Sequence, residues 1–353
     1  MTRARNILVT IACMLGMVMF TTSCEHKDLC YHHPHSSKMR IDVDWAQFDE
    51  VTPTGMSVML FNETDGSLHT TALSNDITHA YFTLTRGEYH SIVFNQSPSE
   101  FGTVLFHDMD NYHNARVVTN RYLSRWYVSR SDDSREVADQ PEWIAADRSH
   151  NIVVTDAMVT EAARCYAPGS VVNPIEAQEF VIDTLVPLNI IHTLNVKVNM
   201  TGIQELRSAR ASITGLAEGY IFSTEMPTTS CVTQLLETWK LSSDESDTWE
   251  GEGPIPGYIT AQITFFGLPD GHCADEDENI FELSLLLVDN KTKVDYIYNV
   301  GHLITRDPEK ENTWNLELSI GELPNVVPEG ATGAGFNATV DDWEDGEDIS
   351  IGV

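Results

Sequence analysis

Four histidines near the N-terminus are the first candidate for metal chemistry. Imidazoles placed this closely can share one transition-metal ion. A working site also needs a rigid surrounding shell that orients the rings, and a histidine-rich linker does not supply one. We therefore expect no metal function from His26, His32, His33 and His35.

Two acidic runs, at 275–278 and 341–348, are the second candidate, because carboxylates chelate calcium. Neither run has the alternating ligand spacing and the hinge glycine of a calcium loop. Solvated acidic loops are the better interpretation, and we expect no bound metal and no cofactor.

Catalytic motifs are absent from the sequence. It has no Gly-x-Ser-x-Gly elbow, no His-Glu-x-x-His and no phosphate-binding loop. Trp126, Tyr127 and Trp143 could form a sugar-stacking platform, although aromatic residues at this density usually belong to a sandwich core. We expect core residues, and we expect that the protein is not an enzyme.

The N-terminus has the anatomy of an export signal. Arg3 and Arg5 precede an apolar stretch at 7–20, and small polar residues then lead to Cys24. The stretch is too short for a spanning helix of roughly 20 residues. We predict a signal peptide over 1–23, a lipid on Cys24 and a tether over 24–37. The alternative is an ordinary secretory signal followed by an incidental cysteine.

A lipid on Cys24 implies an outer-membrane lipoprotein that faces the periplasm or the cell surface, with the surface favoured. Four cysteines then remain in the exported body, where an oxidising compartment permits disulfides. Their spacing leaves all three connectivities open. These cysteines are Cys30, Cys165, Cys231 and Cys273.

The charge of the chain excludes one class of partner. It has 21 Lys+Arg against 53 Asp+Glu, a net charge of −32. Such a chain repels nucleic acid and gains no affinity from counterion release. Solubility in a crowded envelope is the simplest reason for the charge.

Apolar and polar residues alternate with period two along most of the chain. This pattern predicts strands rather than helices. A short helix or irregular connection is expected only at 131–148. The pattern divides the chain near residues 175–185, which predicts an N-terminal sandwich over 38–180 and a C-terminal sandwich over 181–353. The expected strands are 39–45, 56–62, 80–84, 88–95, 190–200, 211–216, 259–266, 281–288, 295–300 and 312–320, with Lys291 in a hairpin turn.

Several phrases of the sequence carry a resemblance to a known family. They are CEHKDLC at 24–30, SARASITGLA at 208–217, ITFFGL at 263–268 and GFNATVDDW at 335–343. Together they resemble the fimbrillin-like and minor-fimbrium anchor-like lipoproteins of Bacteroidetes. The resemblance implies two tandem transthyretin-like (Greek-key) β-sandwiches and fimbrial subunits of the same family as partners.

Two functions follow as alternatives. The first is an anchor or accessory subunit of a fimbrium-like surface structure involved in adhesion. The second is a surface lipoprotein that binds a glycan or a host protein through its sandwich loops. Thr184, in an Asp-Thr-Leu triplet, resembles the O-glycosylation acceptor of exported Bacteroidetes proteins.

The resemblance also implies that fibre subunits of this kind lose their first strand to a protease that cuts after arginine. The neighbouring subunit then fills the groove. Arg40 lies within the expected first strand at 39–45, so cutting there would leave most of that strand in place. We therefore expect the chain to keep Cys24 and to stay at the membrane. Its segment 336–353 is then the candidate joint that inserts into a neighbouring subunit. The alternative is that this segment is the last strand of its own sandwich.

Overall fold

The computed structural model describes residues 35–48, 52–130, 132–149, 151–165, 180–243, 253–269 and 279–328. Within these ranges the protein is almost entirely β-structure, and α2 (Asp156–Cys165) is its single α-helix. The strands form five sheets. The all-β prediction is therefore confirmed.

Two sheets enclose the N-terminal core. The smaller has the order β12 (Val181–Leu185), β1 (Ser36–Val43), β4 (His79–Thr85). The larger has the order β13 (Leu188–Asn189), β10 (Ala145–Arg148), β5 (Gly87–Asn95), β2 (Met56–Asn62), β3 (Leu68–Ser74), and β11 (Ile152–Val154) also pairs with β5. Alternating residues of β1 point into the core between the two sheets, as the period of a strand requires.

The helix α2 closes one side of this core. It begins after Thr155, whose Oγ1 accepts a hydrogen bond from the backbone N–H of Met158 at 3.2 Å. Val159 and Ala162 are buried against the N-terminal core. The segment expected at 131–148 as a short helix or an irregular connection has no helix among its described residues, and it contains β9 (Glu136–Ala138) and β10 joined by irregular residues.

The sheet containing β2 and β5 is buried on both faces. Six of the seven residues of β2 are buried, and five of these six are apolar, as in a strand covered on both faces. Its second face packs on a four-stranded sheet of order β17 (Met226–Pro227), β16 (Gly219–Ile221), β7 (Arg116–Thr119), β6 (Val104–His107). Between them lies a core that Phe61, Phe94 and Phe222 share, and we call it the middle core.

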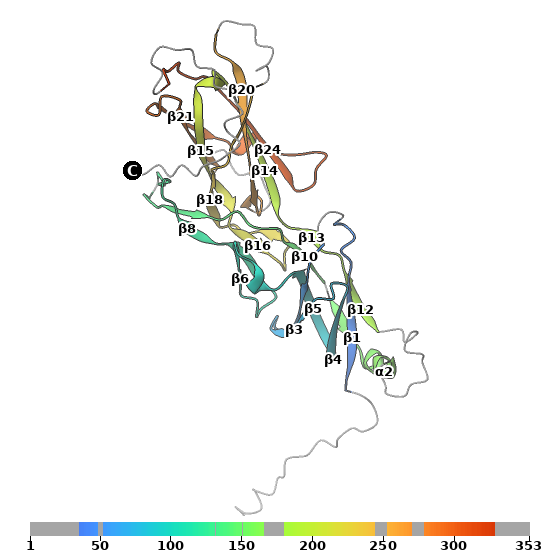
Figure 1. Cartoon of the computed structure of the whole chain (residues 1–353). Coiled ribbons are helices and arrows are strands. Elements are labelled where there is room, and N and C mark those ends of the chain that lie inside the picture. Colours follow the sequence, from blue (N-terminus) through green and yellow to red (C-terminus); the bar gives the residue numbers. More distant parts are fainter. Residues whose placement is uncertain are drawn as a thin grey trace, which may run out of the picture.

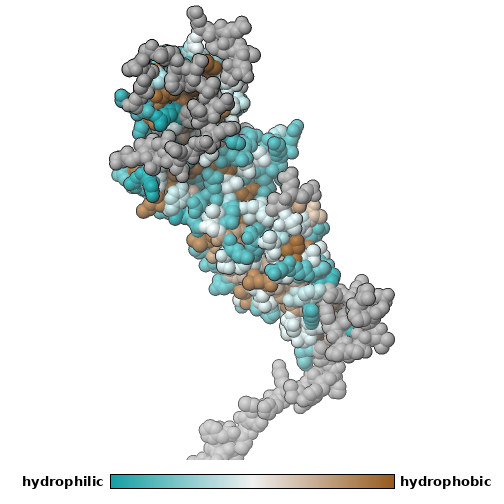
Figure 2. Space-filling view, in the orientation of Figure 1, coloured by the Kyte–Doolittle hydropathy of each residue, from teal (hydrophilic) through white to brown (hydrophobic). Residues whose placement is uncertain are grey.

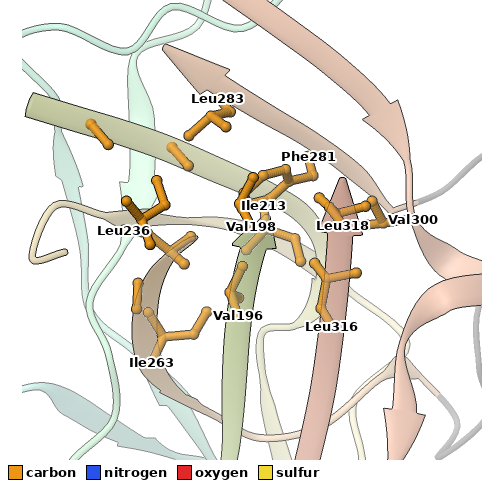
Figure 3. Packing of buried hydrophobic residues seen from close by; sticks show 14 of the residues in the cluster. Val196, Val198, Ile213, Leu236, Ile263, Phe281, Leu283, Val300, Leu316 and Leu318 are labelled. Atoms are coloured by element: carbon orange, nitrogen blue, oxygen red, sulfur yellow. The ribbon is translucent and has the colours of Figure 1, made fainter. Parts of the chain in front are cut away.

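Two further sheets enclose the C-terminal core. The first has the order β19 (Lys240–Ser243), β20 (Pro256–Phe265), β14 (His192–Thr201), β24 (Thr313–Glu322), β23 (Thr305–Arg306). The second has the order β22 (Lys293–Asn299), β21 (Ile280–Leu287), β15 (Leu206–Ala217), β18 (Cys231–Leu236), β9, β8 (Arg121–Leu123). Figure 3 shows their inward side chains meeting, with Val196 and Leu316 from one sheet and Ile213 and Phe281 from the other.

Short 3-10 turns lie between some of these strands. They are η1 (Pro98–Glu100), η2 (Ile203–Glu205) and η4 (Gly301–Leu303). The hairpin turn expected at Lys291 is confirmed between β21 and β22, where Asp289 accepts hydrogen bonds from the N–H groups of Lys291 and Thr292. The long strand β15 begins directly after η2.

The strands cross the predicted division near residue 180 in both directions. β12 and β13, which follow it, pair with β1 and β10 in the N-terminal sheets. β8 and β9, which precede it, join the C-terminal sheet through β18. Figure 1 shows the result as an elongated molecule, with β1, β4 and α2 toward one end and β15, β20 and β21 toward the other. The division into two folding units stays a prediction.

The C-terminal sandwich contains a titratable group that makes its stability depend on pH. The ring of His192 lies 5.9 Å from that of Phe265 and 6.1 Å from that of Trp314. Burial, followed by the charge of Arg306, lowers the pKa of His192 to about 4. Since the folded-state pKa lies below the unfolded value of 6.5, the unfolded state binds the extra proton between pH 6.5 and pH 4.

We therefore expect the free energy of unfolding to fall through this window, with His192 contributing on the order of 3 kcal/mol to the loss. Urea denaturation of the wild type and of His192→Gln at pH 7 and at pH 4.5 checks this. The loss should be smaller in the variant. His302→Gln, which replaces an exposed imidazole, is the control. An equal loss in all three proteins would contradict the assignment.

Candidate functional site

The first strand, β1, is the candidate site of attachment because it begins at Ser36, at the end of the predicted tether over 24–37. It pairs antiparallel with β4 over Ser36–Asp42 and in parallel with β12 over Arg40–Val43, so both of its backbone edges are occupied from Arg40 to Asp42. Met39 and Ile41 are completely buried in the N-terminal core. Removing β1 would leave the facing edges of β4 and β12 unpaired and would open the core.

Arg40 lies in the middle of this pairing. Its backbone N–H donates to the carbonyl of Phe180 at 2.8 Å. Its register partners are Tyr81 and Val181. Its guanidinium binds Asp42 through two contacts, of 2.6 and 3.1 Å, and the side chain is only 19% exposed. A protease that needs an extended, unpaired substrate cannot reach this bond in the folded protein.

The bounds of β1 correct one step of the sequence interpretation. The strand begins at Ser36 because Ser36, Ser37 and Lys38 also pair with β4, and it ends at Val43. A cut after Arg40 would therefore remove five of its eight residues rather than leave most of the strand. Hydrogen bonding and burial protect the bond after Arg40 from cleavage, whereas its position within the strand does not.

The predicted modification sites fall in different places. Thr184 lies on the sheet-edge strand β12 with its side chain exposed, and its backbone N–H binds the Asp183 carboxylate at 2.9 Å. Cys231 is exposed at the start of β18. Cys165 ends α2, and its side chain is not described. Cys24, Cys30 and Cys273 lie outside the described residues, so lipidation and disulfide pairing stay predictions.

The predicted metal candidates also lie mostly outside the described ranges. Of the four histidines only His35 is described, and both acidic runs and the segment 336–353 are outside. Among the described residues, no group of three or more His, Cys, Asp and Glu side chains could hold a metal ion. No helix in those ranges is long and apolar enough to span a bilayer. Figure 2 shows the apolar residues of one face as separate patches on a largely polar surface.

The three aromatic residues considered as a sugar platform do not come together. Tyr127 is buried in a small cluster with Val137 and Leu235, and Trp126 packs against it with the two rings 6.3 Å apart. Trp143 belongs to the N-terminal core, where its ring lies 5.3 Å from that of Phe48. The core interpretation is confirmed for Tyr127 and Trp143.

Sequence reasoning missed a set of arginine–carboxylate pairs beside β18. Arg121 binds Glu136 and Glu218, each at 2.7 Å, and Arg130 binds Glu282 at 2.7 Å. Partners as far apart in the sequence as Arg130 and Glu282 meet only because β9 joins the C-terminal sheet. No local pattern in the sequence signals such a pair.

Solved structures define the class of fold. A putative adhesin from Bacteroides ovatus ATCC 8483 superposes with a TM-score of 0.53 at 14% identity, covering 86% of this chain and 99% of the other. The fimbrial anchor protein Mfa2 from Porphyromonas gingivalis matches with a TM-score of 0.44 at 9% identity, covering 80% and 90%. The first match confirms, at the level of the fold, the resemblance to Bacteroidetes surface proteins inferred from the sequence.

The family follows from the sequence itself. Residues 23–237 match the family described as a domain of unknown function (DUF5119), and the chain belongs to that family. No curated protein matches the sequence.

Proposed function

We propose that this protein is a cell-surface lipoprotein that serves as an anchor or accessory subunit of a fimbrium-like structure involved in adhesion. The fold shared with the Bacteroides ovatus adhesin supports the proposal. The observation that carries it is the position of β1, which follows the tether and is paired on both sides. The role is structural rather than catalytic, and other fimbrial subunits are the proposed partners.

The geometry suits a chain that is held by its N-terminus. Eleven residues lie between Cys24 and Ser36, so the lipid lies at most about 40 Å from the start of β1. Force applied through the tether enters a strand that β4 holds from Ser36 and that β12 also holds from Arg40. In Figure 1 the C-terminal sheets lie toward the end opposite β1, so they would project away from the membrane.

The alternative remains a surface lipoprotein that binds a glycan or a host protein through its sandwich loops. The genes beside this one discriminate between the two. Several lipoproteins of the same pattern favour assembly, whereas a transporter or a glycoside hydrolase favours ligand capture. The net charge of −32 argues against nucleic acid as a partner.

The lipid anchor is tested by replacing the acceptor cysteine. Cys24→Ala should abolish incorporation of a fatty-acid label and move the protein from the membrane to the soluble fraction. All of the predicted acyl chains are on Cys24, and stable anchoring needs more than one of them. Cys30→Ala, six residues further on, is the matched control and should keep both label and membrane. A Cys24→Ala protein that stays fully in the membrane fraction would sink the proposal.

A further inference from the structure

A long hairpin crosses from the N-terminal half of the chain to the C-terminal sheet. It consists of β8, β9 and the residues between them, and we call this segment, 121–138, the ribbon. β9 pairs with β18 only at Ala138 and Gln234. Farther out, Trp126 Nε1 donates to Glu237 at 2.7 Å and Arg130 binds Glu282 on β21. The ribbon is therefore tied to the C-terminal sheet at both its base and its tip.

A cavity of about 670 Å³ lies between the ribbon and the strands β15, β18 and β21. Its wall includes Thr214 and Gly215 of β15. These two residues form a bulge, since the pairing of β15 with β18 shifts between Ile213 and Leu216 and Gly215 has a φ of +74°. The volume lies within the range of ordinary small-molecule sites.

The charges that line the cavity nearly cancel. Arg121 and Arg130 face the carboxylates of Glu136 and Glu282 through the ion pairs already described, and Asp132 adds one more carboxylate. In a chain with a net charge of −32, this lining offers no excess of positive charge to an anion. Its guanidinium and carboxylate groups are planar and present paired hydrogen-bond donors and acceptors. Such pairs can bind two neighbouring hydroxyl groups of one ligand.

Hydroxyl and apolar groups complete the lining. Ser129, Ser134 and Thr233 contribute hydroxyls, while the partly exposed Ile280 contributes apolar surface. A ligand that fits this mixture carries many hydroxyl groups and no net charge, and it presents a C–H face to Ile280. Peptides satisfy this description poorly, because the wall offers charged side chains rather than a row of apolar pockets.

We propose that this cavity binds a short neutral oligosaccharide. The proposal goes beyond the anchoring role and stands on the cavity alone, so either one can fail without the other. Glu282 and Thr233 are the residues expected to bind ligand hydroxyls from β21 and β18, and Arg130 holds the ribbon over the site.

The test uses the full mature protein in detergent on an array of neutral and anionic glycans, followed by titration calorimetry with the best neutral glycan. Glu282→Gln and Thr233→Val keep the shapes of the side chains and should each weaken binding about tenfold or more. Glu317→Gln replaces an exposed carboxylate on the other sheet of the same sandwich and should bind like the wild type.

Melting temperatures of all variants check that the fold is intact. If Thr233→Val unfolds, Glu282→Gln alone tests the proposal. Specific binding of a neutral glycan, lost in the cavity variants and kept in the control, supports the proposal. Three results overturn it. They are no neutral glycan bound, binding only to anionic glycans or to peptides, and binding that the cavity variants leave unchanged.

Discussion

Replacing Ile41 by alanine should lower the free energy of unfolding by about 2–5 kcal/mol. The side chain is completely buried in the N-terminal core, and it lies on a strand that is held on both edges. Truncation leaves a cavity between two sheets that the surrounding backbone cannot close. Urea denaturation followed by circular dichroism measures the loss.

The same variant reports on the protection of Arg40. Because β1 opens more often when its core contact is lost, an arginine-specific protease should cut the peptide bond after Arg40 faster in Ile41→Ala than in the wild type. Leu73→Ala is the control, since Leu73 is 62% exposed on the edge strand β3 and its loss should cost little. Equal stability and equal cleavage in both variants would show that β1 is not held as described.

Replacing Phe222 by alanine should cost about 3–5 kcal/mol and should disturb both halves of the chain. Phe222 follows β16 in the C-terminal half, yet its ring lies 5.8 Å from that of Phe94 on β5 and 6.2 Å from that of Phe106 on β6. Hydrogen exchange should therefore accelerate in β2 and β5, which lie in the N-terminal half, as well as in β7 and β16.

Phe281→Ala is the matched control for this coupling. Phe281 is equally buried, but it belongs to the C-terminal core alone, so exchange should accelerate mainly in β15 and β21. If Phe222→Ala left exchange in β2 and β5 unchanged, the middle core would not couple the halves. The predicted division near residue 180 would then describe two independent units.

Alternation in the sequence predicts those strands that have one buried and one exposed face. The strands expected at 281–288 and 312–320 match β21 and β24 within two residues. Such strands can be recognised from the local sequence alone, because their side chains alternate between core and solvent.

The arrangement of the sheets could not be predicted in the same way. β2 reads as a strand, but nothing local shows that a second sheet covers its other face. That second sheet takes β6 and β7 from one half and β16 and β17 from the other, so it depends on pairings between residues about 100 positions apart. The helix α2 was missed because, among its described side chains, only Val159 and Ala162 are buried.

The candidate sites also divide into those that the local sequence predicts and those that depend on distant residues. A leader and its cysteine are linear features, so the sequence alone predicts Cys24 as the lipid acceptor. The protection of Arg40 and the cavity under the ribbon depend on partners that are distant in the sequence. Arg40 needs β12, which begins about 140 residues later, and Arg130 needs Glu282.

Mass spectrometry of the native protein from the cell envelope tests the central claim most directly. The account predicts a mature chain that begins at Cys24, carries several acyl chains on that residue and keeps β1 whole. A mature chain that begins at Ile41 without lipid would contradict it, because β1 would then be cut and the protein could not be an anchor.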